Sequence, residues 1–247
     1  MKVEFPFDPI ERAKEAERIV MRGEERLYYR FRGAPYYGGI ATADAIGCTF
    51  LCAYCWNYGR NLNPERYGRF YSPQQVASEL LKIAKKRLFK LFRITGSEPI
   101  LGEPSLKHVT EVVRIIFENK PDSRFILETN GFALGIKEDL VKYLKYPNLL
   151  VRVAIKGTDE DSFELVTGAK KEFFIYPIRA LRKLQEENIR AWPAVMGDLF
   201  TDDEIKSLKG VLEKEGVKGE IEIEVLEKYP NVMKNMEKRG IAVKREL

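Results

Sequence analysis

Six short apolar segments, rich in β-branched and aromatic residues, alternate along this chain with segments of helical periodicity. Strands separated by helices are typical of parallel βα units, because a parallel strand is reached only through a crossover connection. The segment 149–155 is almost continuously apolar, as expected of a strand in a sheet that is covered on both faces. The pattern predicts an α/β fold with a parallel sheet, and it fits either a barrel or a doubly wound open sheet. The predicted strands are 39–46, 91–95, 125–129, 149–156, 190–195 and 220–226.

Start signals precede several of the predicted helices. Ser72 is followed by a proline and then by Gln75, which together form a capping box. Thr201 and Glu204 form a second capping box, and Gly216 ends the helix that they open. Further helices are predicted to begin at Asp8, at Ser105 and near Pro177, and a shorter one to cover residues 137–143.

Length and composition limit how the chain is organised. Its 247 residues suffice for one large domain, and we expect an N-terminal helical extension over 1–38, a main α/β domain over 39–226 and a C-terminal tail over 227–247. A cytoplasmic protein is expected, because the sequence has no apolar run of about 20 residues and no signal-like start. The net charge of +5 permits an anionic partner without requiring one. Abundant Lys, Arg and Glu beside one His suggest a thermophilic source.

The only three cysteines, Cys48, Cys52 and Cys55, lie within eight residues directly after the first predicted strand. Three clustered thiolates can hold one metal centre, and a [4Fe–4S] cluster usually takes four cysteine ligands. A cluster held by only three leaves one iron open for a substrate or cofactor. The spacing therefore indicates a catalytic cluster rather than a simple electron carrier.

A zinc site is the alternative interpretation, with the three cysteines and the single histidine, His108, as ligands. The sequence lacks the second pair of ligands that zinc sites usually have, and His108 is predicted to lie on the surface in the first turn of a helix. A disulfide is poorly supported, because the cysteines are crowded and odd in number.

The pattern C-x3-C-x-aromatic-C, with Tyr54 directly before the last cysteine, resembles the signature of the radical S-adenosylmethionine (radical SAM) superfamily. The resemblance implies a partial (βα)6 TIM-type barrel of parallel strands. It also implies two cofactors, a [4Fe–4S] cluster on the three cysteines and S-adenosylmethionine (SAM) chelated at the open iron. In that family an electron from the reduced cluster cleaves SAM to methionine and a 5′-deoxyadenosyl radical. An electron donor such as ferredoxin or flavodoxin is therefore an expected partner of an oxidoreductase of this kind.

The second predicted strand ends in the sequence Thr-Gly-Ser-Glu-Pro at residues 95–99, which resembles the family's GGEP motif. The resemblance assigns Gly96, Ser97 and Glu98 to the amino group of SAM. Gly96 would let the backbone approach SAM closely. Ser97 stands where the second glycine of the motif is usual.

Two later segments resemble the activating proteins of glycyl-radical enzymes, such as pyruvate formate-lyase activase. Residues 128–131, Glu-Thr-Asn-Gly, are similar to a (D/E)TNG segment, which implies that Thr129 and Asn130 contact SAM. Lys156, at the end of the fourth predicted strand, matches a family lysine near the carboxylate or ribose of SAM. Ala154 replaces the acidic residue that is usual two positions before that lysine.

These motifs predict an enzyme that generates a radical from SAM and abstracts hydrogen from a substrate that the sequence does not identify. The activase resemblance makes a loop of a glycyl-radical enzyme, and hence a protein, one candidate substrate. With all three cysteines in one site, no thiolates remain for a second cluster. The arginine- and aromatic-rich segment 56–71 supports RNA modification as an alternative hypothesis. A non-catalytic zinc-binding interaction module is the third hypothesis.

Overall fold

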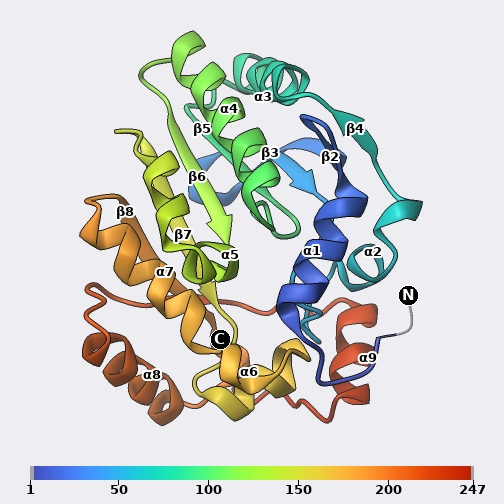
Figure 1. Ribbon diagram of the computed structural model, residues 1–247, viewed down its shortest axis with the longest axis vertical. Helices are drawn as coiled ribbons and strands as arrows, with labels where there is room; N and C mark the ends of the chain where they lie inside the picture. The colour runs from blue at the N-terminus through green and yellow to red at the C-terminus, as the bar shows by residue number, and fades with distance from the viewer. Residues whose placement is uncertain (1–2, 246–247) are drawn as a thin grey trace.

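The structure is a computed structural model and describes residues 3–245 (Figure 1). Six parallel strands form the core of its sheet in the order in which they occur along the chain, which confirms the predicted α/β fold and all six predicted strands. These strands are β3 (Ile40–Ala45), β5 (Leu91–Thr95), β6 (Arg124–Thr129), β7 (Leu149–Ile155), β8 (Arg190–Met196) and β9 (Glu222–Glu224). Within residues 3–245 the two edges of the sheet do not pair with each other, so the barrel is partial and open.

An antiparallel edge, absent from the sequence prediction, extends the sheet ahead of β3. Strand β2 (Glu25–Ala34) pairs with β3, and the short strands β1 (Met21–Arg22) and β4 (Arg69–Tyr71) pair with β2. The boundary predicted between residues 38 and 39 falls inside this β2–β3 hairpin. Charged residues interrupt the apolar alternation of β2, which is why the sequence pattern did not reveal it.

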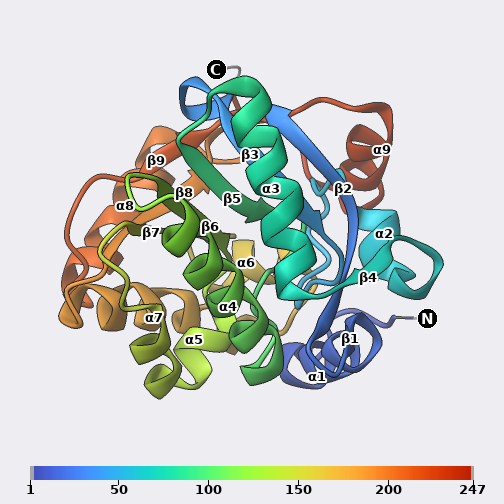
Figure 2. The same cartoon turned by 90° about the horizontal axis from the view of Figure 1, so that it is seen from above.

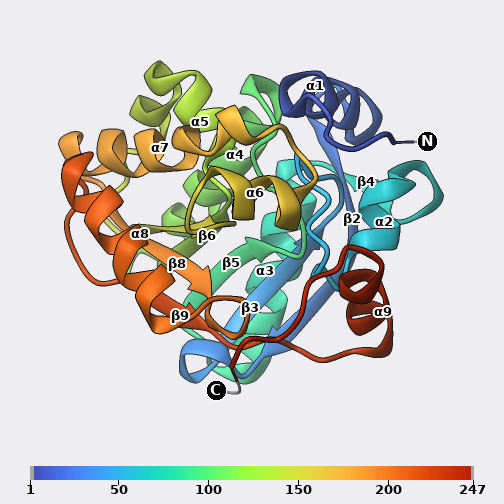
Figure 3. The ribbon, with the colours of Figure 1, turned by 90° about the horizontal axis from the view of Figure 1, so that it is seen from below.

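Helices cover the outside of the curved sheet and one of its sides. Figures 2 and 3 show α3, α4, α7 and α8 around the outside, while α1, α2 and α9 lie on the side of β2 and β4. The helices are α1 (Pro9–Val20), α2 (Tyr58–Leu62), α3 (Pro73–Arg87), α4 (Glu103–Asn119), α5 (Phe132–Ile136), α6 (Glu160–Thr167), α7 (Ile175–Glu186), α8 (Asp202–Lys214) and α9 (Pro230–Lys238). Short 3-10 helices are η1 (Tyr36–Gly38), η2 (Pro64–Arg66), η3 (Glu138–Leu144), η4 (Lys171–Phe173) and η5 (Gly197–Leu199).

Both predicted capping boxes are present. The Ser72 hydroxyl accepts a hydrogen bond from the Gln75 backbone N–H at 3.3 Å, and the Gln75 side chain accepts one from Ser72 N–H at 2.9 Å. Thr201 and Glu204 make the same reciprocal pair at the start of α8. Asp8 caps α1 by accepting from the N–H of Ile10 at 2.8 Å.

The helix start predicted at Ser105 is wrong, while the short helix predicted over 137–143 is present as a 3-10 helix. Helix α4 begins at Glu103, so Ser105 is inside its first turn, where its hydroxyl accepts from the N–H of Leu101 and of Gly102. From this position the Ser105 hydroxyl accepts hydrogen bonds from the backbone of the loop before the helix, whereas a capping residue would accept them from the N–H groups of the helix itself. Residues 137–143 largely form the 3-10 helix η3, and the α-helix of this region, α5, comes before it.

Successive strand residues face opposite sides of the sheet, and the two sides differ in chemistry. Phe92, Ile94 and Leu127 belong to the apolar core that the outer helices cover. The opposite side, here called the inner face, carries charged side chains. Arg93 lies 2.7 Å from Glu128 there, and Arg152 lies 3.1 Å from Glu222 and 2.9 Å from Glu224. No helix within residues 3–245 is long and apolar enough to cross a membrane.

Candidate active site

The three cysteines lie on a loop, residues 46–57, that leaves the C-terminal end of β3. The N–H groups of Leu51 and Ala53 donate to the carbonyls of Thr167 and Val166 at 3.1 and 2.9 Å, which ties the loop to the end of α6. The Phe50 ring, 1% exposed, packs edge-on against Phe163 with ring centroids 5.3 Å apart. The loop is therefore fixed in place by the fold before any metal binds.

All three thiols are free and shielded from solvent. Cys52 is buried, while Cys48 and Cys55 are half-buried. Burial raises the pKa of each thiol to about 12, so the metal-free loop holds protonated thiols. Metal binding must displace those protons, which makes assembly of a metal centre here dependent on pH.

Amide groups surround two of the sulfur atoms. The Cys48 Sγ lies 3.4 Å from the Phe50 backbone N and 3.9 Å from Asn130 Nδ2, and the Cys55 Sγ lies 3.8 Å from Asn61 Nδ2. Donors to sulfur are among the features by which a protein adjusts an iron–sulfur cluster. Asn130 was predicted as a SAM contact, and the structure places it beside the cysteine loop.

The loop after β5 brings Gly96 and Ser97 next to the cysteine loop. Gly96 has φ +87°, and a Cβ there would lie 3.1 Å from the Asp44 Cβ, so this close approach of two strand ends requires glycine. The Asn57 side chain donates to the Gly96 carbonyl, and the Ser97 hydroxyl donates to Asn61 Oδ1 at 2.7 Å. Asn57 and Asn61 thus join the two loops.

Glu98 connects the ends of β5 and β6. Its carboxylate, 3% exposed, accepts hydrogen bonds from the Thr129 hydroxyl at 2.6 Å, from Asn130 N–H at 2.7 Å and from Ile100 N–H at 2.9 Å. Burial raises the pKa of Glu98 to about 7, although these hydrogen bonds oppose the shift. Most of its capacity to accept is used inside the protein, so its position suits holding Thr129 and Asn130 in place.

Lys156 and Tyr54 form a pair on the other side of the cysteine loop. The Lys156 Nζ lies 5.4 Å from the centre of the Tyr54 ring. Burial alone would lower the pKa of Lys156, but Tyr54, Glu224 and Cys52 outweigh it and raise that pKa above its ordinary value. The Tyr54 hydroxyl is buried and has no hydrogen-bond partner of normal geometry among residues 3–245. A cation and an unpartnered hydroxyl therefore lie together beside Cys52.

The strand position where Ala154 replaces an acidic residue is buried and apolar. Ala154 is in register with Ala194 on β8, and both methyl groups are buried. The charged groups nearest along the chain are Lys156 and, on β7, Arg152. The structure thus shows a small-residue pair where a carboxylate would stand in the activase pattern.

His108 is buried instead of lying on the surface as predicted, and it takes no part in this site. It is 2% exposed, its Nε2 lies 3.0 Å from the Tyr28 hydroxyl and its Nδ1 lies 2.7 Å from the Glu24 carbonyl. Both ring nitrogens are therefore occupied. The prediction of a surface histidine is wrong, because α4 packs this side of its second turn against β2, and the Cys3His zinc set is contradicted.

The cysteine loop fits an iron–sulfur cluster better than a single ion. Across the described residues, no three His, Cys, Asp or Glu side chains gather where one metal ion could be held. In a cubane cluster each cysteine binds a different iron, so the ligands surround a larger body than one ion. One buried and two half-buried thiols on one anchored loop, with amide donors at two of the sulfurs and the Tyr54 hydroxyl close by, are consistent with such a cluster and a cosubstrate beside it.

Several residues of this site were missed by the sequence analysis. Asn57 and Asn61, both buried, hold the loops together, and Arg12 and Arg26 lie close behind the cysteine loop. Segment 56–71, where an RNA-binding surface was considered, forms α2, η2 and β4, and its Arg60 donates to Asn57 Oδ1 at 3.0 Å. The spacing of Asn57 and Asn61 after the last cysteine was the only signal, and Asn is too common in loops for such spacing to be specific.

A family model described as the radical SAM superfamily matches residues 45–210 of this chain. Curated relatives include a GTP 3′,8-cyclase of Trichodesmium erythraeum, 30% identical over 125 residues, which are 50% of this chain and 36% of that protein. A GTP 3′,8-cyclase of Microcystis aeruginosa is 27% identical over 122 residues, or 49% of this chain and 35% of that protein. The match thus spans about a third of the length of these relatives.

Solved structures show the same fold at low sequence identity. Native anSMEcpe with bound AdoMet aligns with a TM-score of 0.55 at 18% identity, covering 75% of this chain and 53% of that chain. Streptococcus suis SuiB bound to S-adenosylmethionine aligns with a TM-score of 0.61 at 14% identity, covering 81% and 42%. A spore photoproduct lyase variant with bound AdoMet and dinucleoside spore photoproduct gives 0.63 at 14% identity, covering 88% and 65%.

Proposed function

Because this chain belongs to the radical SAM superfamily, whose enzymes use a [4Fe–4S] cluster and SAM, we propose that it cleaves SAM reductively and uses the resulting radical to abstract hydrogen from a substrate. One observation carries the proposal. The cysteine loop, the Gly96–Glu98 segment and the Thr129–Asn130 segment meet at the C-terminal ends of β3, β5 and β6, joined by side-chain hydrogen bonds. That end of parallel strands is where βα barrels place their ligands.

In this proposal Cys48, Cys52 and Cys55 hold the cluster. When bound, the cluster supplies the electron that cleaves SAM to methionine and a 5′-deoxyadenosyl radical. Asn61 and Asn130 direct amide groups toward two of the sulfurs, and the packed loop shields the site from water. These residues orient and enclose the site rather than react.

The same region of the protein offers groups that complement those of SAM. Gly96 and Ser97 offer a half-buried turn of backbone for its amino group, and the buried Glu98 follows that turn directly. Lys156 holds a positive charge for the SAM carboxylate, and the buried Tyr54 hydroxyl lies beside it, without a hydrogen bond of normal geometry to any described residue. The Thr129 hydroxyl donates to Glu98. Asn130, the next residue, instead directs its side chain toward Cys48.

The test is anaerobic reconstitution with iron and sulfide, reduction, addition of SAM and measurement of 5′-deoxyadenosine. We expect product from the parent protein and none from Cys52→Ala, because one lost ligand prevents a stable three-cysteine cluster. His108→Ala is the matched control and is expected to keep the iron and the product. A parent protein that takes up zinc, without acid-labile sulfide, would refute the proposal.

Two candidate substrates are supported by different observations. The matched curated relatives are GTP 3′,8-cyclases, which supports a purine nucleotide. The Thr129–Asn130 segment supports a glycine-containing loop of a partner protein, as in the activases, although Ala154 departs from their pattern. Deuterated GTP and a deuterated glycine-loop peptide can be compared under the same conditions. The true substrate transfers deuterium to 5′-deoxyadenosine, and a compound that transfers none is excluded.

A further inference from the structure

Two arginines of the N-terminal segment are buried behind the cysteine loop without a carboxylate partner. Arg12 on α1 is 6% exposed and Arg26 on β2 is 0% exposed. Within residues 3–245 neither forms an ion pair, whereas the buried Asp44, Arg93 and Arg152 all do. Of the buried arginines that the structure describes, these two are the ones without an ion pair.

Each guanidinium donates a hydrogen bond to a residue that lies close to one of the cysteines. Arg12 Nη2 donates to the Asn61 carbonyl at 2.7 Å, and the Asn61 side chain is the amide beside the Cys55 sulfur. Arg26 Nη2 donates to the Glu98 carbonyl at 2.6 Å and to the Ile46 carbonyl at 3.3 Å. Ile46 lies two positions before Cys48 in the sequence. The Nε of each arginine is buried with no hydrogen-bond partner in the described structure.

Burial of a guanidinium without a counter-charge is costly. The effective penalty for an uncompensated buried ion is several kcal/mol, and carbonyl contacts offset only part of it. Burial lowers the pKa of Arg12 and of Arg26. Cys48 and Glu15 oppose that shift for Arg12, and Tyr28, Glu17 and Glu98 oppose it for Arg26. Arginine nevertheless stays protonated in proteins. The fold therefore keeps two positive charges beside the cysteine loop, and within residues 3–245 neither guanidinium forms a direct ion pair with a carboxylate.

We propose that Arg12 and Arg26 are the counter-charges of the bound cluster and raise its reduction potential. The inference rests on the cluster assignment under Proposed function. A cubane core held by three thiolates is a net anion, and a one-electron donor of low potential makes it more negative still. Fixed positive charge nearby therefore stabilises the reduced state more than the oxidised state. The N-terminal segment, which carried no recognisable motif, would then adjust the redox chemistry of the site.

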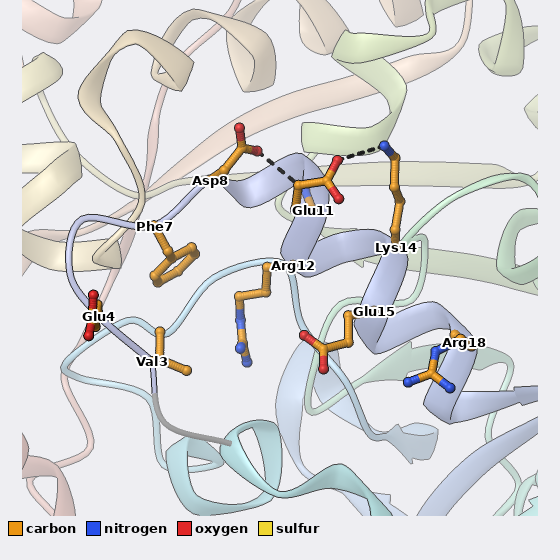
Figure 4. A pocket seen from close by; sticks show the side chains of 9 residues that line it. All are labelled: Val3, Glu4, Phe7, Asp8, Glu11, Arg12, Lys14, Glu15 and Arg18. Atoms are coloured by element: carbon orange, nitrogen blue, oxygen red, sulfur yellow. Dashed lines mark hydrogen bonds and ion pairs between the residues drawn. The ribbon is translucent and has the colours of Figure 1, made fainter.

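Arg12 is the better of the two for mutation. Figure 4 shows its side chain extending from α1 between Phe7 and Glu15, at a cavity of about 520 Å³ along that helix. Arg26 instead crosses the interior and supports two loop carbonyls, so its removal threatens folding. Arg18 lies on the same helix, lines the same cavity and is exposed, which makes Arg18→Gln a matched control.

The experiment is a potentiometric titration of the reconstituted cluster, followed by electron paramagnetic resonance, with iron and sulfide measured for each variant. Arg12→Gln is expected to keep the parent iron content and to lower the equilibrium constant for reduction at least tenfold, which is about 59 mV for one electron. Arg12→Lys keeps the charge and is expected to stay near the parent potential. Arg18→Gln is expected to shift little, because solvent screens its charge.

An unchanged potential in fully loaded Arg12→Gln overturns the inference, and so do equal shifts in Arg12→Gln and Arg12→Lys, since charge would then not be the cause. If Arg12→Gln loads less iron than the parent, Glu15→Gln decides instead. Glu15 opposes the positive field of Arg12, so its neutralisation should make the potential more positive, and no shift overturns the inference. A parent protein that binds no cluster refutes the proposed function itself, and this inference with it.

Discussion

Glu98 is a single carboxylate that three hydrogen bonds hold between two strand ends. Its pKa of about 7 lies above its ordinary value of 4.5 because of burial. The folded protein therefore holds a proton that the unfolded chain has released between those two pH values. The Glu98 contribution to the free energy of unfolding consequently decreases as pH rises from about 4.5 through about 7.

Glu98→Gln is expected to flatten this pH dependence, because glutamine does not titrate. It also replaces one acceptor oxygen by an NH2 group, which costs about 1–3 kcal/mol of unfolding free energy for the unsatisfied backbone donor. Urea unfolding of both proteins at pH 5 and pH 8 measures the two effects. Equal pH dependence in parent and variant would show that Glu98 is not the titrating group.

His108→Ala tests the buried link between α4 and β2. Removal of the ring leaves the Tyr28 hydroxyl and the Glu24 carbonyl without their partner, and we expect a loss of about 1–3 kcal/mol of unfolding free energy. Burial lowers the pKa of His108 to about 4 from 6.5, so the stability that it contributes is present above pH 6.5 and is lost as pH falls toward 4. Denaturation curves of the parent and of His108→Ala should lie closer together at pH 5 than at pH 7. An equal separation at both pH values would show that His108 is not the titrating group.

At this scale the sequence predicted residues of specific spacing and missed residues defined by tertiary contacts. The three cysteines lie together because eight residues of one loop contain them all. Glu98 and Thr129 were predicted from strand ends, and the structure joins them by a hydrogen bond. Arg12 and Arg26 could not be predicted, because a charged residue is normally assigned to the surface and only the packed fold shows its burial.

Among the elements, α9 connects the end of the chain with the cysteine loop. Val232 and Met236 bury its apolar side in the core. Directly after it, Arg239 donates to the carbonyls of Leu51 at 2.9 Å and Leu165 at 3.0 Å. The segment predicted as a featureless tail therefore supports the loop on which the proposed cluster lies.

Arg239→Ala is expected to loosen the cysteine loop, because two carbonyl contacts and the packing of the guanidinium on the Phe5 ring at 3.9 Å are lost together. Hydrogen bonds to a charged group contribute about 1.5–3 kcal/mol each. Hydrogen–deuterium exchange of residues 48–55 should accelerate in the variant. Exchange that stays at the parent rate would show that α6 alone fixes the loop.

Element prediction succeeded where capping chemistry or a buried strand gave a local signal, as for α3, α8 and β7. It failed for β2, whose Arg30 and Arg32 lie on the inner face and share Asp44. Both arginine side chains stay partly exposed, at 45% and 25%, and break the apolar alternation of the strand, while the Asp44 carboxylate that they share is buried. The strand could be identified only with its partner β3 in view.

Across the whole molecule, ion pairs on the inner face join strands that are distant in sequence. Arg93 and Glu128 join β5 to β6, and Arg152 reaches from β7 to Glu222 and Glu224 on β9. The Trp192 ring N–H donates to Glu222 from the strand between them. This network helps an unclosed sheet to keep its curvature.

Arg152→Met is expected to destabilise the whole domain by about 3–5 kcal/mol, because it removes the cation that Glu222 and Glu224 share and leaves Glu224 only Lys156. Arg190→Met removes the same charge from an exposed position on β8 and serves as the control. Thermal unfolding of both variants is the measurement. A loss in Arg152→Met no larger than in the control would mean that solvent already screens the pair.

The contact between Arg239 and the cysteine loop also determines when the site can be completed during biosynthesis. A ribosome releases residues 48–55 long before it synthesises Arg239, so the nascent chain exposes its thiols while a support of their loop is still missing. We expect assembly factors that deliver iron and sulfur to find the loop fully supported only after translation of the C-terminal helix. We expect iron loading in cells to follow release of the chain from the ribosome, and thiol-blocking reagents to act fastest before it.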